Sequence, residues 1–104
     1  MRKRRSDRNH AIYVITNIVT NEQYIGLTAI NPNGVKQSIR RRIQKHVQRA
    51  SIEDKDWGLC NSIRKYKPEN FTFGLLEIVR GKAQAHKREL EYIREYNPIL
   101  NTFK

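Results

Sequence analysis

The feature that most constrains the fold is a pair of β-rich segments near the start of the chain. Residues 10–17 read His-Ala-Ile-Tyr-Val-Ile-Thr-Asn, and residues 23–28 read Gln-Tyr-Ile-Gly-Leu-Thr. β-Branched and aromatic residues favour strands, and the Asn21-Glu22 pair between the two segments is typical of a turn. The segments therefore predict a β-hairpin, with an extension of its first strand through Ile18, Val19 and Thr20 left open.

A helix is predicted over residues 36–50, after the turn-forming segment Asn-Pro-Asn-Gly at 31–34. Its apolar residues recur at every fourth position and predict one buried stripe, formed by Ile39, Ile43 and Val47. Three other residues share the adjacent face because they are spaced at i, i+4 and i+7: Arg42, His46 and Arg49. Side chains on this second face can approach one ligand together.

The second half of the chain predicts a helix, a strand and a last helix. The first of these helices covers residues 57–66, with Asp54 or Asp56 as its cap. Its inner face is expected to consist of Leu59, Ile63 and Tyr66. The strand covers residues 70–79, and its alternating inner residues are expected to be Phe71, Phe73 and Leu75.

The last helix is predicted over residues 83–96, between Gly81 and Pro98. Glu89 lies at the edge of its expected inner stripe, which consists of His86, Leu90, Ile93 and Asn97. Residues 99–103 are expected to pack as an extended tail.

The order strand, strand, helix, helix, strand, helix predicts an α+β fold of sandwich type, with three helices flanking a small three-stranded antiparallel sheet. We expect one domain over residues 10–104, preceded by a flexible basic arm over residues 1–9. A chain of 104 residues suffices for one compact domain with a modest core. Five aromatic residues are expected in that core: Trp57, Tyr66, Phe71, Phe73 and Phe103.

Positive charge dominates the composition. The chain has 21 Lys and Arg residues against 10 Asp and Glu residues, which gives a net charge of +11, and residues 23–52 contain no acid. A dense polyanion is the natural partner, because each phosphate that is neutralised releases counterions. The open alternatives are a solubilising surface and an anionic membrane, although no segment pairs this charge with a large apolar face.

Other classes of protein are disfavoured. No run approaches the roughly 20 apolar residues of a membrane span, and no secretory signal follows the basic start of the chain. The single cysteine, Cys60, fits a reducing interior and is expected to be a small buried residue. We therefore expect a cytoplasmic protein of a bacterium or a phage-infected host. His10, His46 and His86 lack the spacing of zinc ligands.

Two tripeptides on the predicted hairpin, Ile12-Tyr13-Val14 and Tyr24-Ile25-Gly26, resemble the signature of the GIY-YIG nuclease family. Segments 42–46, 89–93 and 97–101 are similar to its Arg-x-x-x-His helix, its Glu-x-x-x-Ile helix and its closing Asn segment. The resemblance covers residues 11–103. The chain departs from the pattern at Ala11, where the family usually has Gly, and in a longer connection around residues 30–36.

The resemblance implies six catalytic residues, namely Tyr13, Tyr24, Arg42, His46, Glu89 and Asn101. Glu89 is the implied sole carboxylate ligand of one Mg²⁺ or Mn²⁺ ion per active site. Arg42 is implied to contact the scissile phosphate. Tyr13 is the implied general base, either directly or by relaying a proton to His46, with Arg42 and the metal stabilising its phenolate.

Further contacts with the substrate are predicted for Gly26, whose missing side chain permits close approach of the backbone, and for Arg40, Arg41, Lys45 and Arg49. Without the resemblance, simpler interpretations stay open. Glu89 then becomes a surface ion pair, Asn101 a turn or capping residue, and His46 a partly buried histidine. Tyr13 and Tyr24 become packed strand aromatics.

The predicted function is therefore a metal-dependent endonuclease of homing or phage type that hydrolyses DNA phosphodiester bonds and nicks one strand per active site. It would act on double-stranded DNA as a monomer or a dimer. The alternative is a non-catalytic basic module of the same fold that binds DNA or RNA, and a basic protein-interaction domain is a third hypothesis. Target specificity, biological role and the role of residues 30–36 stay open.

Overall fold

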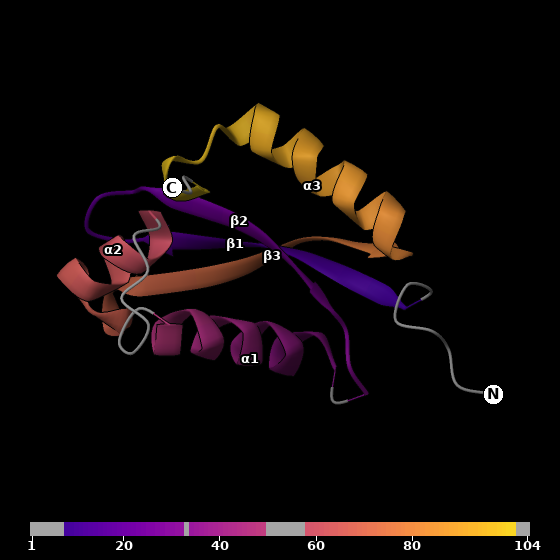
Figure 1. The fold of residues 1–104 in the computed structure, drawn as a ribbon, viewed down its shortest axis with the longest axis horizontal. Helices are drawn as coiled ribbons and strands as arrows, with labels where there is room; N and C mark the ends of the chain where they lie inside the picture. Colours follow the sequence, from indigo (N-terminus) through magenta and orange to yellow (C-terminus); the bar gives the residue numbers. More distant parts are fainter. Residues whose placement is uncertain (1–7, 33, 50–57, 102–104) are drawn as a thin grey trace.

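The structure is a computed structural model that describes residues 8–32, 34–49 and 58–101. These residues form strands and helices in the predicted order (Figure 1): β1 Asn9–Asn17, β2 Gln23–Ala29, α1 Val35–Gln48, α2 Gly58–Tyr66, β3 Phe71–Arg80 and α3 Lys82–Tyr96. Two 3₁₀ turns, η3 Pro68–Asn70 and η4 Ile99–Asn101, complete the fold. The predicted α+β fold is confirmed. Asn9, expected in the flexible arm, instead opens β1, and residues 1–7 of that arm lie outside the described residues.

β1 is the central strand of an antiparallel sheet with the order β2-β1-β3. Figure 1 shows α3 on one side of the strands and α1 on the other. Because β1 has a neighbouring strand at each edge and helices on both sides, Ala11, Ile12 and Tyr13 are fully buried and Ile15 nearly so. This double burial explains the unbroken apolar run at 11–15, which a strand with one wet face does not need.

The main core lies between β1 and the pair α1 and α2. Alternate residues of β1 contribute to it, because successive side chains of a strand point to opposite faces. The buried members of this core are Ala11, Tyr13, Ile15, Ile39, Leu59, Ile63 and Leu100, with Ile43 and Val47 packed against them. The predicted stripe of α1 and the inner residues Leu59 and Ile63 of α2 are therefore confirmed.

β1 ends at Asn17 and does not extend through Ile18, Val19 and Thr20. The buried side-chain Oδ1 of Asn17 accepts hydrogen bonds from the backbone nitrogens of Val19 at 2.9 Å and Thr20 at 3.3 Å. Its Nδ2 donates to the hydroxyl of Ser62 on α2 at 3.0 Å. These bonds favour a turn over a continued strand, and Ile18 is accordingly exposed.

The alternation predicted for β3 is only partly correct. Phe71 packs against the core, but Phe73 and Leu75 are 41% and 47% exposed, so Phe73 is not a core residue. These two residues pair with Ile15 and Tyr13 across the ladder, so they share the side of the sheet on which α1 packs. α1 packs on β1 and β2, and the edge strand β3 therefore keeps these side chains in contact with solvent.

The face of α3 that packs against the sheet differs from the predicted one. Leu90 is 55% exposed and the His86 side chain 57% exposed, whereas Ala85 is fully buried and the side chain of Glu89 is only 15% exposed. The small side chain of Ala85 lets the helix approach the sheet closely. The helix is turned by about one residue from the orientation that apolar periodicity alone predicts.

A polar contact with β3 accounts for this rotation. The Glu77 carboxylate accepts a hydrogen bond from Arg88 Nη2 at 2.8 Å, two weaker ones from Arg88 Nε, and one from the Tyr92 hydroxyl at 2.8 Å. Arg88 also pairs with Glu91. Arg88 and Tyr92 are four residues apart, so they lie on one face of α3. Their shared partner on β3 holds that face toward the sheet, and Glu89 follows beside it.

The chain after α3 forms a turn where an extended tail was expected. Residues 99–101 make the 3₁₀ turn η4, which buries Leu100. Several predictions lie outside the described residues or side chains, namely those for Asp54, Asp56, Trp57, Phe103 and the Cys60 side chain.

We expect Asn17→Ala to lower the free energy of unfolding by about 2–4 kcal/mol, because it leaves two backbone donors and the Ser62 hydroxyl without their partner. Urea denaturation measures this loss. Val19→Ala, at a 59% exposed position in the same turn, is the control and should change stability by less than about 0.5 kcal/mol. Equal effects of the two substitutions would show that the Asn17 bonds do not stabilise the hairpin end.

Candidate active site

Tyr13 of β1 and His46 of α1 form a buried hydrogen-bonded pair. The Tyr13 hydroxyl lies 3.2 Å from His46 Nε2, and the two residues are 0% and 3% exposed. Burial, together with the nearby cations Arg42 and Arg49, lowers the pKa of His46 to about 4. His46 is therefore a neutral imidazole at physiological pH, and Nε2 accepts the tyrosine proton if the ring carries its own proton on Nδ1.

Burial also raises the pKa of Tyr13 above its ordinary value, and the neighbouring Tyr24 raises it further. Arg42 lowers this pKa, as predicted, but its effect is smaller than that of burial. The protein alone therefore keeps Tyr13 protonated as a donor to His46. Of the two predicted routes for Tyr13, this arrangement favours relay to His46 over a standing phenolate.

Gly26 makes room for the aromatic side chains of the site. It pairs with Tyr13 across the β1–β2 ladder, and a methyl group at its Cα would lie 2.5 Å from Cζ and Oη of Tyr13 and 2.8 Å from a ring carbon of Tyr24. The Tyr24 ring packs edge-on against His46, with ring centres 5.2 Å apart. Sequence reasoning explained Gly26 by close approach of substrate, whereas the structure shows a packing requirement. A substrate contact at Gly26 stays a prediction.

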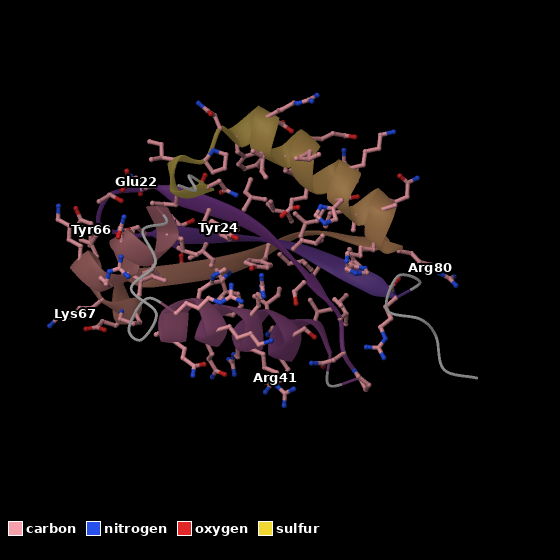
Figure 2. All side chains as sticks on the ribbon, in the orientation of Figure 1. Glu22, Tyr24, Arg41, Tyr66, Lys67 and Arg80 are labelled. Carbon is pink, nitrogen blue, oxygen red and sulfur yellow. The ribbon has the colours of Figure 1, made fainter. Side chains whose placement is uncertain are left out.

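A cavity of about 600 Å³ opens beside this pair, between α1, β2 and α3. Figure 2 shows Tyr24 among the side chains between α1 and α3, with Lys67 toward one end of the molecule and Arg80 toward the other. The charged and titratable residues that line the cavity, besides Tyr24, are Arg8, His10, Arg41, Arg42, Lys45, Lys82, His86 and Glu89. Within the described residues, Glu89 is the one carboxylate on its walls.

Glu89 is a partly buried carboxyl group in cationic surroundings. Burial raises its pKa, while His86 and Arg42 lower it. Its Oε1 lies 3.4 Å from Nδ1 of His86, one helical turn earlier. A carboxylate that is costly to bury and faces a polar cavity is suited to hold a divalent cation together with water.

Arg42 extends from α1 into the same cavity. Its Nε is buried and has no hydrogen-bond partner in the described part of the chain. A buried guanidinium nitrogen without a partner is costly, and an oxyanion in the cavity would satisfy it. This agrees with the predicted phosphate contact of Arg42.

The other predicted basic contacts divide into two groups. Arg41 and Lys45 line the cavity beside Arg42. Arg40 is exposed and lies outside its lining, and Arg49 is near enough to His46 to lower the pKa of that imidazole. A substrate contact of Arg40 would therefore have to lie outside the cavity.

Asn101 anchors the chain end to β2. Its Oδ1 accepts a hydrogen bond from the Ile25 nitrogen at 2.7 Å, and its Nδ2 donates to the Ile25 carbonyl at 2.8 Å. Both polar groups of the side chain are thus engaged with the residue between Tyr24 and Gly26. The geometry assigns Asn101 a positioning role, and direct participation in catalysis stays a prediction.

Residues 30–36, whose role the sequence leaves open, are in part packed into the fold. Ile30 packs against the core, and the buried hydroxyl of Ser38 accepts from the Asn31 nitrogen and donates to the Gly34 carbonyl. Asn31 also lines the cavity. Sequence reasoning missed Ser38 and the cavity residues Arg8 and Lys82, because no local pattern marks them.

The comparisons with known proteins agree with this geometry. The model of the GIY-YIG catalytic domain matches residues 9–104. The chain belongs to the GIY-YIG family. It is therefore a DNA endonuclease by family. The solved catalytic domain of the intron endonuclease I-TevI has the same fold, with a TM-score of 0.70, 22% sequence identity and 92% of each chain covered. A comparison with curated proteins gave no match.

Two further features are absent from the described residues. No helix among the described residues has the length and apolarity needed to cross a membrane. Among the same residues, no group of three or more His, Cys, Asp or Glu side chains gathers as metal ligands do.

We expect Gly26→Ala to lower the free energy of unfolding by about 1–3 kcal/mol and to reduce nuclease activity, because the new methyl group displaces the Tyr13 hydroxyl from His46. Urea denaturation and a cleavage assay measure the two effects. Gly74→Ala is the control, since a methyl group there meets only Val14 Cγ1 at 3.8 Å. If Gly26→Ala behaved like Gly74→Ala, the packing role of Gly26 would be wrong.

The pKa of His46 predicts a pH-dependent stability. Since this pKa is lowered from 6.5 to about 4, the unfolded chain takes up a proton on His46 between these values and the folded chain does not. The contribution of neutral His46 is complete above pH 6.5 and is lost as the pH falls toward 4. It should decrease by about 2 kcal/mol from about pH 7.5 to about pH 5.

Urea denaturation of the native chain and of His46→Gln at both pH values isolates this contribution. The variant cannot titrate at position 46, so the difference in stability between the two proteins should shift by about 2 kcal/mol in favour of the variant at the lower pH. A difference independent of pH would mean that His46 titrates alike in the folded and unfolded chains.

Proposed function

We propose that this GIY-YIG endonuclease is metal-dependent and nicks one DNA strand at each active site. One observation carries the proposal: a single carboxylate, Glu89, shares a cavity with a set of Arg and Lys side chains and lies beside the Tyr13–His46 pair. Phosphodiester hydrolysis needs a deprotonated water, charge stabilisation on the phosphoryl oxygens and a cation near the leaving oxygen. The cavity walls offer the carboxylate and the cations. The Tyr13–His46 pair is buried behind Tyr24, which lines the cavity and packs against both rings.

The donor set on the cavity wall fits one Mg²⁺ or Mn²⁺ ion. Mg²⁺ retains several waters and binds proteins through one or two carboxylates, and Glu89 is a single carboxylate with 15% of its side chain exposed. When bound, the ion acts as a Lewis acid on the phosphate and supports the departing oxygen. Glu89 on α3 would hold the ion, and Arg42 on α1 lines the same cavity.

Tyr13 and His46 form the proton path in this proposal. The Tyr13 hydroxyl takes a proton from the attacking water while its own proton passes to His46 Nε2, 3.2 Å away. An imidazolium is unfavourable there, because burial and, to a smaller extent, Arg42 and Arg49 disfavour positive charge on His46. A DNA phosphate at Arg42 adds negative charge beside His46 and so raises its basicity when substrate is bound.

The cations of the cavity are proposed to bind the DNA backbone. Arg8 and Lys82 lie on the β1 and α3 sides, and Arg41, Arg42 and Lys45 lie on α1, so a phosphate in the cavity meets positive charge on several sides. Each such contact strengthens binding at low salt and makes it salt-dependent. One chain supplies one such cavity, and cutting both strands then requires a second copy or a second encounter.

Nicking of supercoiled plasmid in the presence of Mg²⁺ is the direct test. We expect Glu89→Gln to reduce the rate by about 10²–10³-fold, because the uncharged amide is a poor metal ligand. Glu95→Gln is the matched control, since Glu95 is an exposed residue of the same helix that does not line the cavity. EDTA should abolish nicking by the native chain.

If Glu89→Gln nicked plasmid at the native rate, Glu89 would have no role in catalysis. Salt-dependent DNA or RNA binding without nicking in any divalent metal would favour the other candidate, a non-catalytic basic module of the same fold.

A further inference from the structure

His86 lies one turn before Glu89 on α3, and both side chains line the cavity. Nδ1 of His86 is 3.4 Å from Oε1 of Glu89. Residues three apart on a helix share a face, so the pair presents a nitrogen and an oxygen to the same part of the cavity. The imidazole is 57% exposed and needs little desolvation to bind a ligand.

The separation of these two atoms suits a shared metal ion. Ligand atoms that each lie about 2.1 Å from one ion are about 3.0 Å apart at a right angle and about 3.4 Å apart at the tetrahedral angle. The observed 3.4 Å matches the tetrahedral spacing and exceeds the right-angle spacing by about 0.4 Å. Small side-chain rotations therefore suffice for both atoms to reach one ion, without movement of α3.

We propose that His86 is a second protein ligand beside Glu89, so that this cavity binds imidazole-preferring transition metals such as Ni²⁺ and Co²⁺ more tightly than Mg²⁺. Imidazole suits these ions, whereas Mg²⁺ prefers oxygen ligands. The inference rests on the proposed function only in taking Glu89 as a metal ligand.

The walls around His86 and Glu89 are rich in positively charged side chains. The cavity already carries Arg8, Arg41, Arg42, Lys45 and Lys82. His86 as a neutral ligand adds a nitrogen donor there without adding to this positive charge. The remaining coordination positions fall to water and phosphate oxygens, since the described residues offer no third His, Cys, Asp or Glu in one group.

Isothermal titration of the untagged, DNA-free protein with NiCl₂ and with MgCl₂ tests the proposal. In the native chain we expect Ni²⁺ to bind at least about tenfold more tightly than Mg²⁺. His86→Ala should weaken Ni²⁺ binding by about tenfold or more and change Mg²⁺ binding by less than about threefold. Glu89→Ala should weaken the binding of both ions.

Two further variants separate a ligand from an ion-pair partner. His86→Lys keeps a cation beside Glu89 but offers an ammonium group that cannot bind metal, so Ni²⁺ binding should fall at least as far as in His86→Ala. Lys82→Ala removes a positive charge from the same cavity wall, one turn before His86, and should not weaken Ni²⁺ binding. If His86 were only a cation that competes for Glu89, His86→Ala would leave Ni²⁺ affinity unchanged or higher, which overturns the proposal.

Paramagnetic NMR gives a readout that does not depend on affinity. Addition of Co²⁺ to the native chain should produce a hyperfine-shifted imidazole N–H signal that is absent in His86→Ala and present in Lys82→Ala. A spectrum without that signal at saturating Co²⁺ contradicts direct ligation by His86.

The two proposals fail in different ways. If the native chain nicks DNA with Mg²⁺ but His86→Ala binds Ni²⁺ as tightly as the native chain, only the proposal that His86 is a second ligand is rejected. Ni²⁺ binding through His86 and Glu89 without nicking in any metal rejects the proposed nuclease activity and supports the metal site.

Discussion

The hydrogen bond between the Tyr13 hydroxyl and His46 Nε2 is the contact on which the site depends. It joins the central strand β1 to α1 beneath the cavity, and Gly26 makes it sterically possible by leaving room for the Tyr13 ring. Asn101 then binds both peptide groups of Ile25, the residue before Gly26. Tyr13 belongs to the hydrophobic core and His46 is buried beside it. A change that disturbs the packing there also disturbs this hydrogen bond.

Burial and positive charge act in opposite directions on the pKa of Tyr13 and in the same direction on the pKa of His46. Burial raises the pKa of Tyr13 and lowers that of His46, so both groups are neutral in the protein alone. The cations of α1 favour a phenolate and disfavour an imidazolium. A bound phosphate would change that balance because it adds the negative charge that the cavity lacks. In the proposed mechanism, the basic residues would thus act locally at one cavity as well as attract nucleic acid in general.

The errors of sequence-based prediction have a common origin. Apolar periodicity predicted a stripe on α3 that included Leu90, but Glu77 of β3 holds Arg88 and Tyr92 toward the sheet, and Leu90 faces solvent. Alternation on β3 predicted a buried Phe73, but the helices on that side pack over β1 and β2. In each case a partner distant in sequence decided which face is covered, and periodicity contains no information about that partner.

The order of the elements, the α+β class and the family follow from the sequence alone, and its motifs nominate Tyr13, Arg42, His46 and Glu89 as candidate site residues. These follow from local patterns, because strand and helix periods and short motifs are properties of neighbouring residues. The folded chain alone shows that Gly26 accommodates two tyrosines, that Asn101 anchors β2, and that Arg8, Lys82 and His86 share the cavity with Glu89. Those relations depend on burial and on distances between segments far apart in the chain, which exist only once the chain has folded.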